Sequence, residues 1–334
     1  MTIKVAINGF GRIGRLVLRA ACEQKTKDLE IIAINDLGSV EQNAYLFKYD
    51  SVHGTLSNEI STGDGWMAVD GQKITVTAER DPSKLPWKDL GIDVVMECTG
   101  LFTKRDDALK HIKAGAKRVL ISAPASNADL TVVYGVNHTK LKPEHQVVSN
   151  ASCTTNCLAP VADVLHQLLG IERGFMTTVH SFTGDQRTVD TLHPDPRRAR
   201  AASLSMIPTS TGSAQAIGLV LPELDGLLAG TAVRVPTPNV SMIDFTFDAG
   251  QAGTVSHIND AIIAASEGAL KGILATVDQP LVSVDFNHNP ASSIFDLSQT
   301  QVIDNTFVRI LSWYDNEWGF SNRMLDTARV MGQL

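Results

Sequence analysis

The chain runs from Lys4-Val-Ala-Ile-Asn8 into Gly9-Phe-Gly11-Arg-Ile-Gly14, so a β-branched run is followed at once by the pattern G-x-G-x-x-G. Residues 4–8 have strand character, and the apolar spacing over residues 13–24 is typical of a helix. In such a turn Gly9 permits the tight bend, Gly11 lets the backbone approach a pyrophosphate, and Gly14 lets the helix pack on the strand. The stretch therefore predicts a β-α-β unit that binds a dinucleotide.

An acidic residue supports this interpretation. Asp36 follows the next apolar run, 30–34, near the spacing of about 20 residues at which a carboxylate accepts hydrogen bonds from the adenosine ribose. Because that carboxylate would repel a 2′-phosphate, NAD is favoured over NADP. The helix N-terminus offers N–H groups to the phosphates, and Arg12 either reaches the pyrophosphate or lies solvated at the surface. The alternative is a glycine-rich turn without a ligand.

The pattern of short apolar runs extends over the first 150 residues. Runs at 94–98, 119–122 and 146–149 alternate with helical segments such as 108–114, which predicts a parallel sheet. After residue 150 the sequence pattern changes and predicts a larger, mixed or antiparallel sheet. The strands expected there are 175–180, 233–235, 242–247, 281–286 and 306–313.

Helices and one long polar stretch complete the second half. A helix is expected over 152–169, with Pro160 predicting a kink or a late start. Two further helices are expected, at 258–269 and 318–331. Residues 181–205 have few strand or helix signals, and loops of this length are usually functional or lie at interfaces.

Composition limits the class of protein. The chain has 334 residues, of which 43% are hydrophobic and 19% charged, with a formal net charge of -7. These values predict a soluble globular protein of about two domains, and the net acidity favours neither nucleic acid nor an anionic membrane as a partner. No signal-peptide pattern and no apolar window of about 18 residues is seen. Because four cysteines are too few for a disulfide framework, a reduced, cytoplasmic protein is expected.

One cysteine stands where a nucleophile is expected. Cys153 follows the run 146–149 and opens a helix, whose N–H groups and dipole should lower the thiol pKa and could hold an oxyanion. The alternative is a small buried cysteine. Cys157, one turn further on, is expected to be structural, and the chain offers no second cysteine pair or paired histidines for zinc.

A histidine completes the predicted chemistry. His180 ends the expected strand 175–180 and is the candidate base, with a structural histidine as the alternative. A thiolate, a base and NAD together predict that an aldehyde is captured as a thiohemiacetal and oxidised to a thioester.

Blocks throughout the chain resemble the phosphorylating glyceraldehyde-3-phosphate dehydrogenases. These blocks are 8–15, 149–157, 180–183, 197–202, 208–212, 234–239 and 313–323. The resemblance implies a homotetramer that oxidises the triose phosphate with NAD and inorganic phosphate. It also implies a Rossmann-type NAD domain over residues 1–151 plus 318–334, and an α+β catalytic domain with a mixed or antiparallel sheet over 152–317.

The resemblance also implies roles for particular residues, with Cys153 as nucleophile, His180 as base and no metal. Substrate and phosphate contacts are implied for Ser152, Thr154, Thr183, Arg198 or Arg197, Thr211, Gly212 and Arg234. Cofactor contacts are implied for Gly9, Gly11, Arg12, Ile13, Gly14, Asp36, Arg80, Thr99, Ser122 and Asn316, the last to the nicotinamide carboxamide. For the arginines the alternative is a solvated loop or a subunit contact, and for 209–213 it is an ordinary helix cap.

Some positions depart from the family, and one sister enzyme remains as an alternative. Phe182 and Phe320 stand where many members have tyrosine. Thr191-Leu192 stands where several NAD-strict bacterial members have Leu-Pro, so strictness toward NADP stays open. The stretch 181–205 resembles the loop that lines a neighbouring subunit's cofactor site. Erythrose-4-phosphate dehydrogenase is the alternative activity. That sister enzyme keeps less of the inorganic-phosphate site, whereas residues 209–212 of that site are intact in this chain.

Overall fold

The computed structural model describes residues 2–334, which form two compact units. The first contains the residues up to Val132 together with His138–Ala151 and Ser321–Leu334. The second contains Val133–Asn137 and Ser152–Phe320. Each unit has its own sheet, parallel-dominated in the first and mixed in the second, which confirms the predicted two-part α/β fold.

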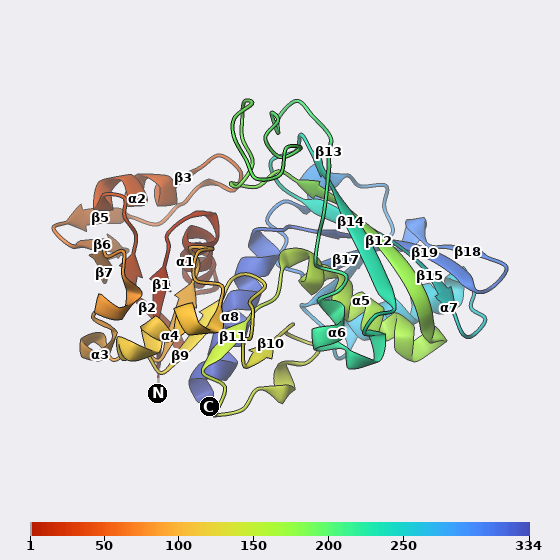
Figure 1. Cartoon of the computed structure of the whole chain (residues 1–334), viewed down its shortest axis with the longest axis horizontal. Helices are drawn as coiled ribbons and strands as arrows, with labels where there is room; N and C mark the ends of the chain where they lie inside the picture. Colours follow the sequence, from red (N-terminus) through yellow and green to blue (C-terminus); the bar gives the residue numbers. More distant parts are fainter. Residues whose placement is uncertain (1) are drawn as a thin grey trace. The chain divides into compact units, whose positions relative to one another are not determined.

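The sheet of the first unit contains nine strands within residues 2–334, in the order β10-β11-β9-β8-β1-β2-β7-β6-β5 (Figure 1). Pairing is parallel from β10 to β7, and β7-β6-β5 adds an antiparallel edge that the sequence did not predict. The strands are β1 Ile3–Asn8, β2 Leu29–Asn35, β5 Ile60–Gly63, β6 Trp66–Val69, β7 Gln72–Thr77, β8 Val94–Glu97, β9 Arg118–Ile121, β10 Leu130–Thr131 and β11 Val147–Ser149. The helices are α1 Arg12–Gln24, α2 Val40–Lys48, α3 Trp87–Leu90 and α4 Arg105–Lys113; a separate small pair is β3 Tyr49–Asp50 with β4 Gly54–Thr55.

Burial explains why β1 lies inside the parallel part of this sheet. Val5, Ala6 and Ile7 have no exposed surface, which is the continuous apolar pattern of a strand covered on both faces. Ala6 packs in a cluster with Trp87 and Val95. With β1 flanked by β2 and β8, the loops after these three strands meet at one edge of the sheet.

The sheet of the second unit contains eight strands within the described chain and is built on long antiparallel pairs, with β12–β14 and β16–β17 parallel. The strands are β12 Ile171–Ser181, β13 Ile207–Thr209, β14 Leu228–Val235, β15 Ser241–Ala249, β16 Leu274–Val277, β17 Ser293–Asp296, β18 Gln301–Ile303 and β19 Phe307–Tyr314. The helices are α5 Cys153–Leu169, α6 Ile217–Val220 and α7 Val255–Glu267; helix α8 Trp318–Gln333 begins in this unit and belongs to the first unit from Ser321 onward. Between β12 and β13 the chain forms the long irregular segment drawn in green in Figure 1.

One local expectation is wrong, and one of the two outcomes expected for Pro160 does not occur. Residues 281–286 contain no strand; the 3₁₀ helix Ser283–Phe286 lies there, and Val282 and Val284 are exposed instead of lining a core. Helix α5 begins at Cys153 and continues through Pro160, so the late start does not occur. Around Pro160 the helix is well packed, with Leu158, Ala159, Ala162 and Leu165 buried, and this packing outweighs the lost backbone hydrogen bond of one proline.

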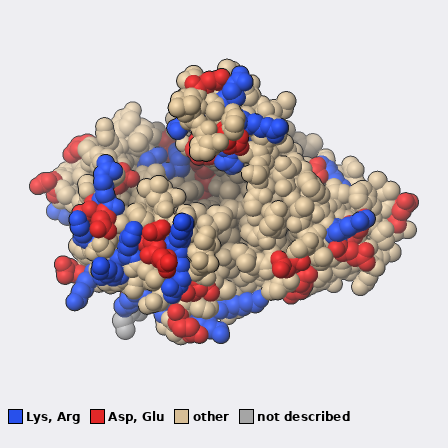
Figure 2. Space-filling view, viewed as in Figure 1, with Lys and Arg blue, Asp and Glu red and all other residues tan. Residues whose placement is uncertain are grey.

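No helix within residues 2–334 combines the length and the apolar character needed to cross a membrane. Lysine and arginine side chains are interspersed with aspartate and glutamate on the face shown in Figure 2.

Candidate active site

The glycine turn after β1 has the shape that its sequence predicts. Gly9 has φ of 90°, and a Cβ there would lie 2.7 Å from the backbone nitrogen of Thr99. A Cβ on Gly14 would lie 2.2 Å from the carbonyl oxygen of Gly9, whereas one on Gly11 would meet nothing within 4 Å. Gly9 and Gly14 are therefore required by the turn itself, and Gly11 leaves open space at the N-terminus of α1.

Asp36 is held rigidly beside this turn. Its Oδ2 accepts a hydrogen bond from the Phe10 N–H at 2.8 Å, and its Oδ1 accepts one from the Gly38 N–H at 2.9 Å. A cavity of about 330 Å³ lies beside the turn, and its lining includes Gly11, Asp36, Arg80 and Thr99. Open backbone, a fixed carboxylate and a free helix N-terminus in one cavity fit a dinucleotide.

Two other predicted cofactor residues lie close by. Ile13 is in the first turn of α1, and Ser122 follows β9, where its backbone N–H binds the Glu97 carbonyl at 3.0 Å. Arg12 opens α1 and forms an ion pair with Asp50, with Nη1 2.6 Å from Oδ2. Burial alone would raise the pKa of Asp50, but the Arg12 hydrogen bond and backbone donors outweigh it and lower that pKa to about 2.

A buried polar network lies behind the cavity and was missed from sequence. The Glu97 carboxylate accepts from Asn8 Nδ2 at 2.6 Å, from the Thr99 N–H at 2.8 Å and from His111 Nε2 at 2.9 Å. Trp87 Nε1 donates to His111 Nδ1 at 3.0 Å, so the His111 proton lies on Nε2. These contacts fix Asn8 and Thr99, both of which line the cavity.

Cys153 is the first residue of α5, in a tightly constrained turn. Ala151 has φ of 56°, a left-handed conformation that is uncommon for residues other than glycine. Ser152 caps α5, because its Oγ accepts from the Thr155 N–H at 3.0 Å. The thiol therefore lies at a helix N-terminus, as predicted.

His180 is the second-last residue of strand β12 and faces Cys153, with its Nε2 3.5 Å from the Cys153 Sγ. Its Nδ1 lies 2.7 Å from the carbonyl oxygen of Ser181. The guanidinium Nη1 of Arg234 also lies 3.0 Å from Nδ1. The Ser181 carbonyl is closer and can only accept, so we assign the proton to Nδ1, and Nε2 then presents a lone pair to the thiol. Burial, and next the positive charge of Arg234, lower the pKa of His180 to about 3, so the imidazole is neutral.

The expected lowering of the Cys153 pKa is wrong for the chain as described. Burial raises the pKa of this thiol, although Arg234, the Thr154 hydrogen bonds and the helix backbone oppose the rise. The free energy needed to remove a thiolate from water is larger here than the stabilisation that the helix N-terminus provides. The resting pair is a protonated thiol beside a neutral imidazole.

A second group of side chains forms a charged cluster near His180. Arg234 Nη1 donates to the Thr183 hydroxyl at 3.2 Å and to the Ser181 carbonyl at 3.0 Å. Arg198 Nη1 pairs with Asp185 at 2.8 Å, and the Thr183 hydroxyl also binds Asp185. Burial alone would raise the pKa of Asp185, but Thr183 and the two arginines outweigh it and lower that pKa.

Arg197 does not join this cluster. Its Nη1 reaches the Pro208 carbonyl at 3.5 Å and its side chain is exposed, whereas Arg198 Nε donates to the Thr209 hydroxyl at 3.0 Å. The geometry favours Arg198 as the arginine placed with Thr183 and Arg234.

The residues predicted for inorganic phosphate are only partly brought together. The hydroxyls of Ser152 and Thr211 both bind the Ser213 hydroxyl, at 2.9 and 3.0 Å. Gly212 is open, with nothing within 4 Å of a Cβ built there. The Thr154 hydroxyl instead binds the phenol of Tyr314 at 2.8 Å.

Several neighbours of the site were missed from sequence. Asp185, Ser213 and Tyr314 are among them, and each is a common residue type without a motif of its own. Only Asp185 gave a local signal, because it lies two residues after Thr183. Asn316 lies in the turn between β19 and α8, where only 5% of its surface is exposed.

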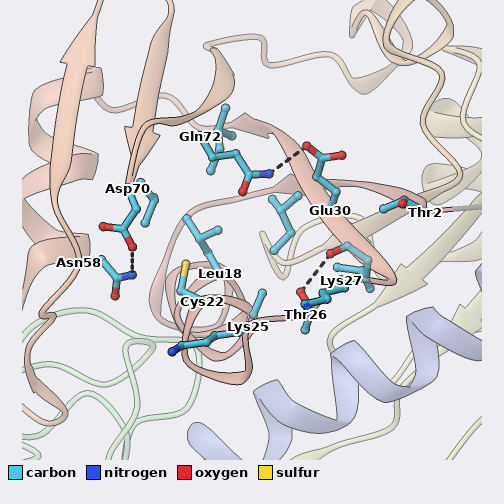
Figure 3. A pocket seen from close by; sticks show the side chains of 15 residues that line it. Thr2, Leu18, Cys22, Lys25, Thr26, Lys27, Glu30, Asn58, Asp70 and Gln72 are labelled. Atoms are coloured by element: carbon cyan, nitrogen blue, oxygen red, sulfur yellow. Dashed lines mark hydrogen bonds between the residues drawn. The ribbon is translucent and has the colours of Figure 1, made fainter.

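Another cavity, of about 380 Å³, lies beside α1 and β2 in the first unit (Figure 3). Its lining includes Cys22 and Lys25, and the Gln72 amide donates to Glu30 across it at 2.9 Å. Burial raises the pKa of Cys22 to about 11, so that thiol is unreactive near neutral pH. None of the residues with predicted roles lines this cavity.

Comparison with known proteins gives consistent matches over the chain. The family model described as glyceraldehyde 3-phosphate dehydrogenase, NAD binding domain, matches residues 3–105, and that for the C-terminal domain matches residues 152–316. The chain is 64% identical to glyceraldehyde-3-phosphate dehydrogenase of Xanthobacter flavus, with all of both chains aligned. It is 58% identical to that of Zymomonas mobilis, over 100% of this chain and 99% of the relative. It is 56% identical to that of Geobacillus stearothermophilus, over 98% of each.

Proposed function

Because the chain belongs to the glyceraldehyde 3-phosphate dehydrogenase family, we propose that it oxidises D-glyceraldehyde 3-phosphate to 1,3-bisphosphoglycerate with inorganic phosphate, through a covalent bond to Cys153. The family makes it an NAD-dependent dehydrogenase. The observation that carries the proposal is the Cys153–His180 pair, 3.5 Å apart at the start of α5. The Arg234 cluster beside it supports a phosphorylated substrate.

The two units are proposed to divide the work. Residues 1–151 plus 318–334 would hold NAD, with Gly11 admitting the pyrophosphate, Asp36 binding the adenosine ribose, and Arg80, Thr99 and Ser122 lining the groove. Residues 152–317 would hold the substrate. When bound, NAD accepts the hydride that leaves the substrate carbon.

His180 handles both protons of the covalent steps. The thiol proton moves to Nε2 while Sγ bonds to the aldehyde carbon, and the imidazolium returns it to the carbonyl oxygen, which gives a thiohemiacetal. Nε2 then takes the hydroxyl proton as the aldehyde hydrogen leaves with its electron pair, and a thioester remains. A substrate phosphate near Arg234 offsets the charge that lowers the His180 pKa, so binding makes this base stronger.

Inorganic phosphate completes the cycle. The hydroxyls of Ser152 and Thr211, with the open backbone of Gly212, would hold the attacking anion. A phosphate oxygen bonds to the thioester carbon and the C–S bond breaks. The leaving sulfur takes back the proton held on Nε2 of His180, which restores the thiol and the neutral imidazole, and the proton of the attacking hydrogen phosphate is released to solvent. The substrate phosphate would be held separately, by Thr183, Arg198 and Arg234.

A coupled assay tests this function against its rival. Purified protein is supplied with glyceraldehyde 3-phosphate or erythrose 4-phosphate, with NAD or NADP, and with or without phosphate. We expect rapid NADH formation from the triose that depends on phosphate. Equal rates without phosphate or arsenate, or a preference for the four-carbon sugar, would instead support a hydrolytic erythrose-4-phosphate dehydrogenase. The predicted cytoplasmic location and homotetramer remain proposals.

A further inference from the structure

The two ends of the Asn316 side-chain amide have different surroundings. Its Oδ1 accepts hydrogen bonds from the Ser181 and Ser241 hydroxyls, each at 2.9 Å. Within residues 2–334 the amide nitrogen has no protein hydrogen bond, and it is not sealed from solvent. A donor is therefore left available on a residue that is otherwise buried.

The hydrogen bonds of the two serines determine which way the amide points. The Ser241 Oγ accepts from the Ser181 N–H at 3.0 Å, and its own hydrogen donates to Asn316 Oδ1 at 2.9 Å, a much shorter contact than the 3.5 Å to the Ser181 Oγ. Both serines are at most 1% exposed, so their hydroxyls cannot donate to bulk water instead. Because an amide oxygen only accepts, two converging hydroxyl donors hold Oδ1 inward and turn Nδ2 outward.

The backbone that carries Asn316 is fixed by its neighbour. Asp315 Oδ1 accepts from the N–H groups of Glu317 and Trp318, at 3.0 and 2.7 Å. Its Oδ2 accepts from Asn239 Nδ2 at 2.8 Å. The turn and the side chain are thus held by separate contacts.

Strained backbone also brings Ser241 to this position. Val240, immediately before it, has φ of 66°, although a β-branched residue rarely adopts the left-handed region. Such a conformation is unfavourable and persists where the surroundings demand it, often at functional sites. Ser241 begins β15, opposite Tyr314 at the end of β19, and Ser181 ends β12.

We propose that Ser181 and Ser241 are positioning residues for the nicotinamide carboxamide. By fixing Oδ1 of Asn316 they present Nδ2 as a donor to the carboxamide oxygen, which selects the face of the ring turned to the substrate. The inference rests on the proposed function, because it concerns the bound nicotinamide. The Ser181 carbonyl also holds the Nδ1 proton of His180, so one residue orients both the base and the cofactor contact.

Calorimetric titration with NAD and with ADP-ribose, which lacks the nicotinamide, tests the proposal. Ser181→Ala, Ser241→Ala and the double variant are compared with the unchanged protein. For the double variant we expect NAD to bind about tenfold more weakly while ADP-ribose affinity changes less than about twofold. Ser241→Cys keeps a similar shape but donates weakly, so it should behave like Ser241→Ala.

Ser293→Ala is the matched control. Ser293 is also fully buried in the sheet of the second unit, and its hydroxyl binds that of Ser312 at 2.7 Å. This variant should bind both ligands like the unchanged protein. Equal weakening of NAD and ADP-ribose in the serine variants, or no weakening of NAD, would overturn the inference. Failure of the unchanged protein to bind NAD would refute the proposed function itself.

Isotope transfer gives a second readout. With substrate deuterated at the aldehyde carbon, NMR of the product NADH locates deuterium on one face of C4 or on both. The unchanged protein should label a single face, whereas the double variant should label both to a measurable extent. Complete retention of single-face labelling in the double variant would contradict the proposed positioning role.

Discussion

Arg234 acts on both members of the proposed catalytic pair, Cys153 and His180. Its positive charge favours the thiolate of Cys153 and disfavours the imidazolium of His180, and it lowers the pKa of both groups. Burial is nevertheless the largest influence on each. A sequence reveals a helix N-terminus but not how deeply a thiol is covered, which is why the predicted direction of the Cys153 shift is wrong.

Replacing Arg234 by glutamine should slow the alkylation of Cys153. Without the guanidinium the thiol pKa rises further, so at pH 8 less thiolate is present and iodoacetamide should react about three- to tenfold more slowly. The rate should climb with pH in both proteins, later in the variant. Arg173→Gln, at an exposed arginine paired with Asp248, should match the unchanged protein. An equal or faster rate for Arg234→Gln at pH 8 would contradict this assignment.

Cys153→Ser should separate chemistry from cofactor binding. A serine hydroxyl is a far weaker nucleophile beside His180, so kcat should fall by more than about 10³-fold. The glycines of the G-x-G-x-x-G turn and Asp36 are unchanged in this variant. NAD affinity, measured by calorimetry, should therefore remain within about twofold. Substantial residual turnover would exclude the covalent route.

At the scale of elements, two glycines at the start of α1 make a contrasting pair. Gly11→Ala places a methyl group in open space, so the melting temperature should stay within about 2 °C while NAD binds at least tenfold more weakly. Gly14→Ala drives its Cβ against the Gly9 carbonyl oxygen, so unfolding should become easier by about 2–4 kcal/mol. Thermal unfolding and NAD titration of both variants check this. Equal melting temperatures for the two variants would show that the turn is more adaptable than its geometry indicates.

Elements with strong local signals could be predicted from sequence. The parallel strands β1, β2, β8 and β9 are largely apolar runs, and the glycine turn has a steric reason at Gly9 and at Gly14. The strand expected at 281–286 is absent because Val282 and Val284 are exposed. Their apolar side chains alone did not indicate whether they are buried. Strand β17 was missed because its four buried residues are too few to show a period.

The site shows the same division between local and long-range information. Cys153 and His180 could be proposed from sequence because each stands at the end of an element, next to a motif. Ser213 and Tyr314 reach the site only through tertiary packing, 61 residues from Ser152 and 160 from Thr154 respectively. No spacing rule for a single sequence connects positions so far apart.

For the whole molecule, the long segment before β13 bears on assembly. Val189, Leu192, Leu204 and Met206 are 70–93% exposed in this chain, which is unusual for large apolar side chains in a protein that acts alone. We therefore expect light scattering to give a mass of about four times 36.0 kDa.

Charges at two of these positions test the role of the segment. Leu192→Asp combined with Leu204→Asp should shift the mass toward smaller species, because buried unpaired carboxylates are costly at an interface. Val255→Asp, at a less exposed valine that opens α7, should leave the mass unchanged. A single-chain mass for the unchanged protein would refute the tetramer.

The end of α8 has a consequence for how the protein is made. Met324, Leu325, Ala328 and Met331 are buried in the first unit, and Gly332 packs so closely on Ile3 that a Cβ would lie 2.4 Å from it. A ribosome releases the strands of that unit long before it reaches these residues. The nascent sheet therefore waits, partly uncovered, for the last helix to emerge, and during translation this is the surface on which a chaperone would act.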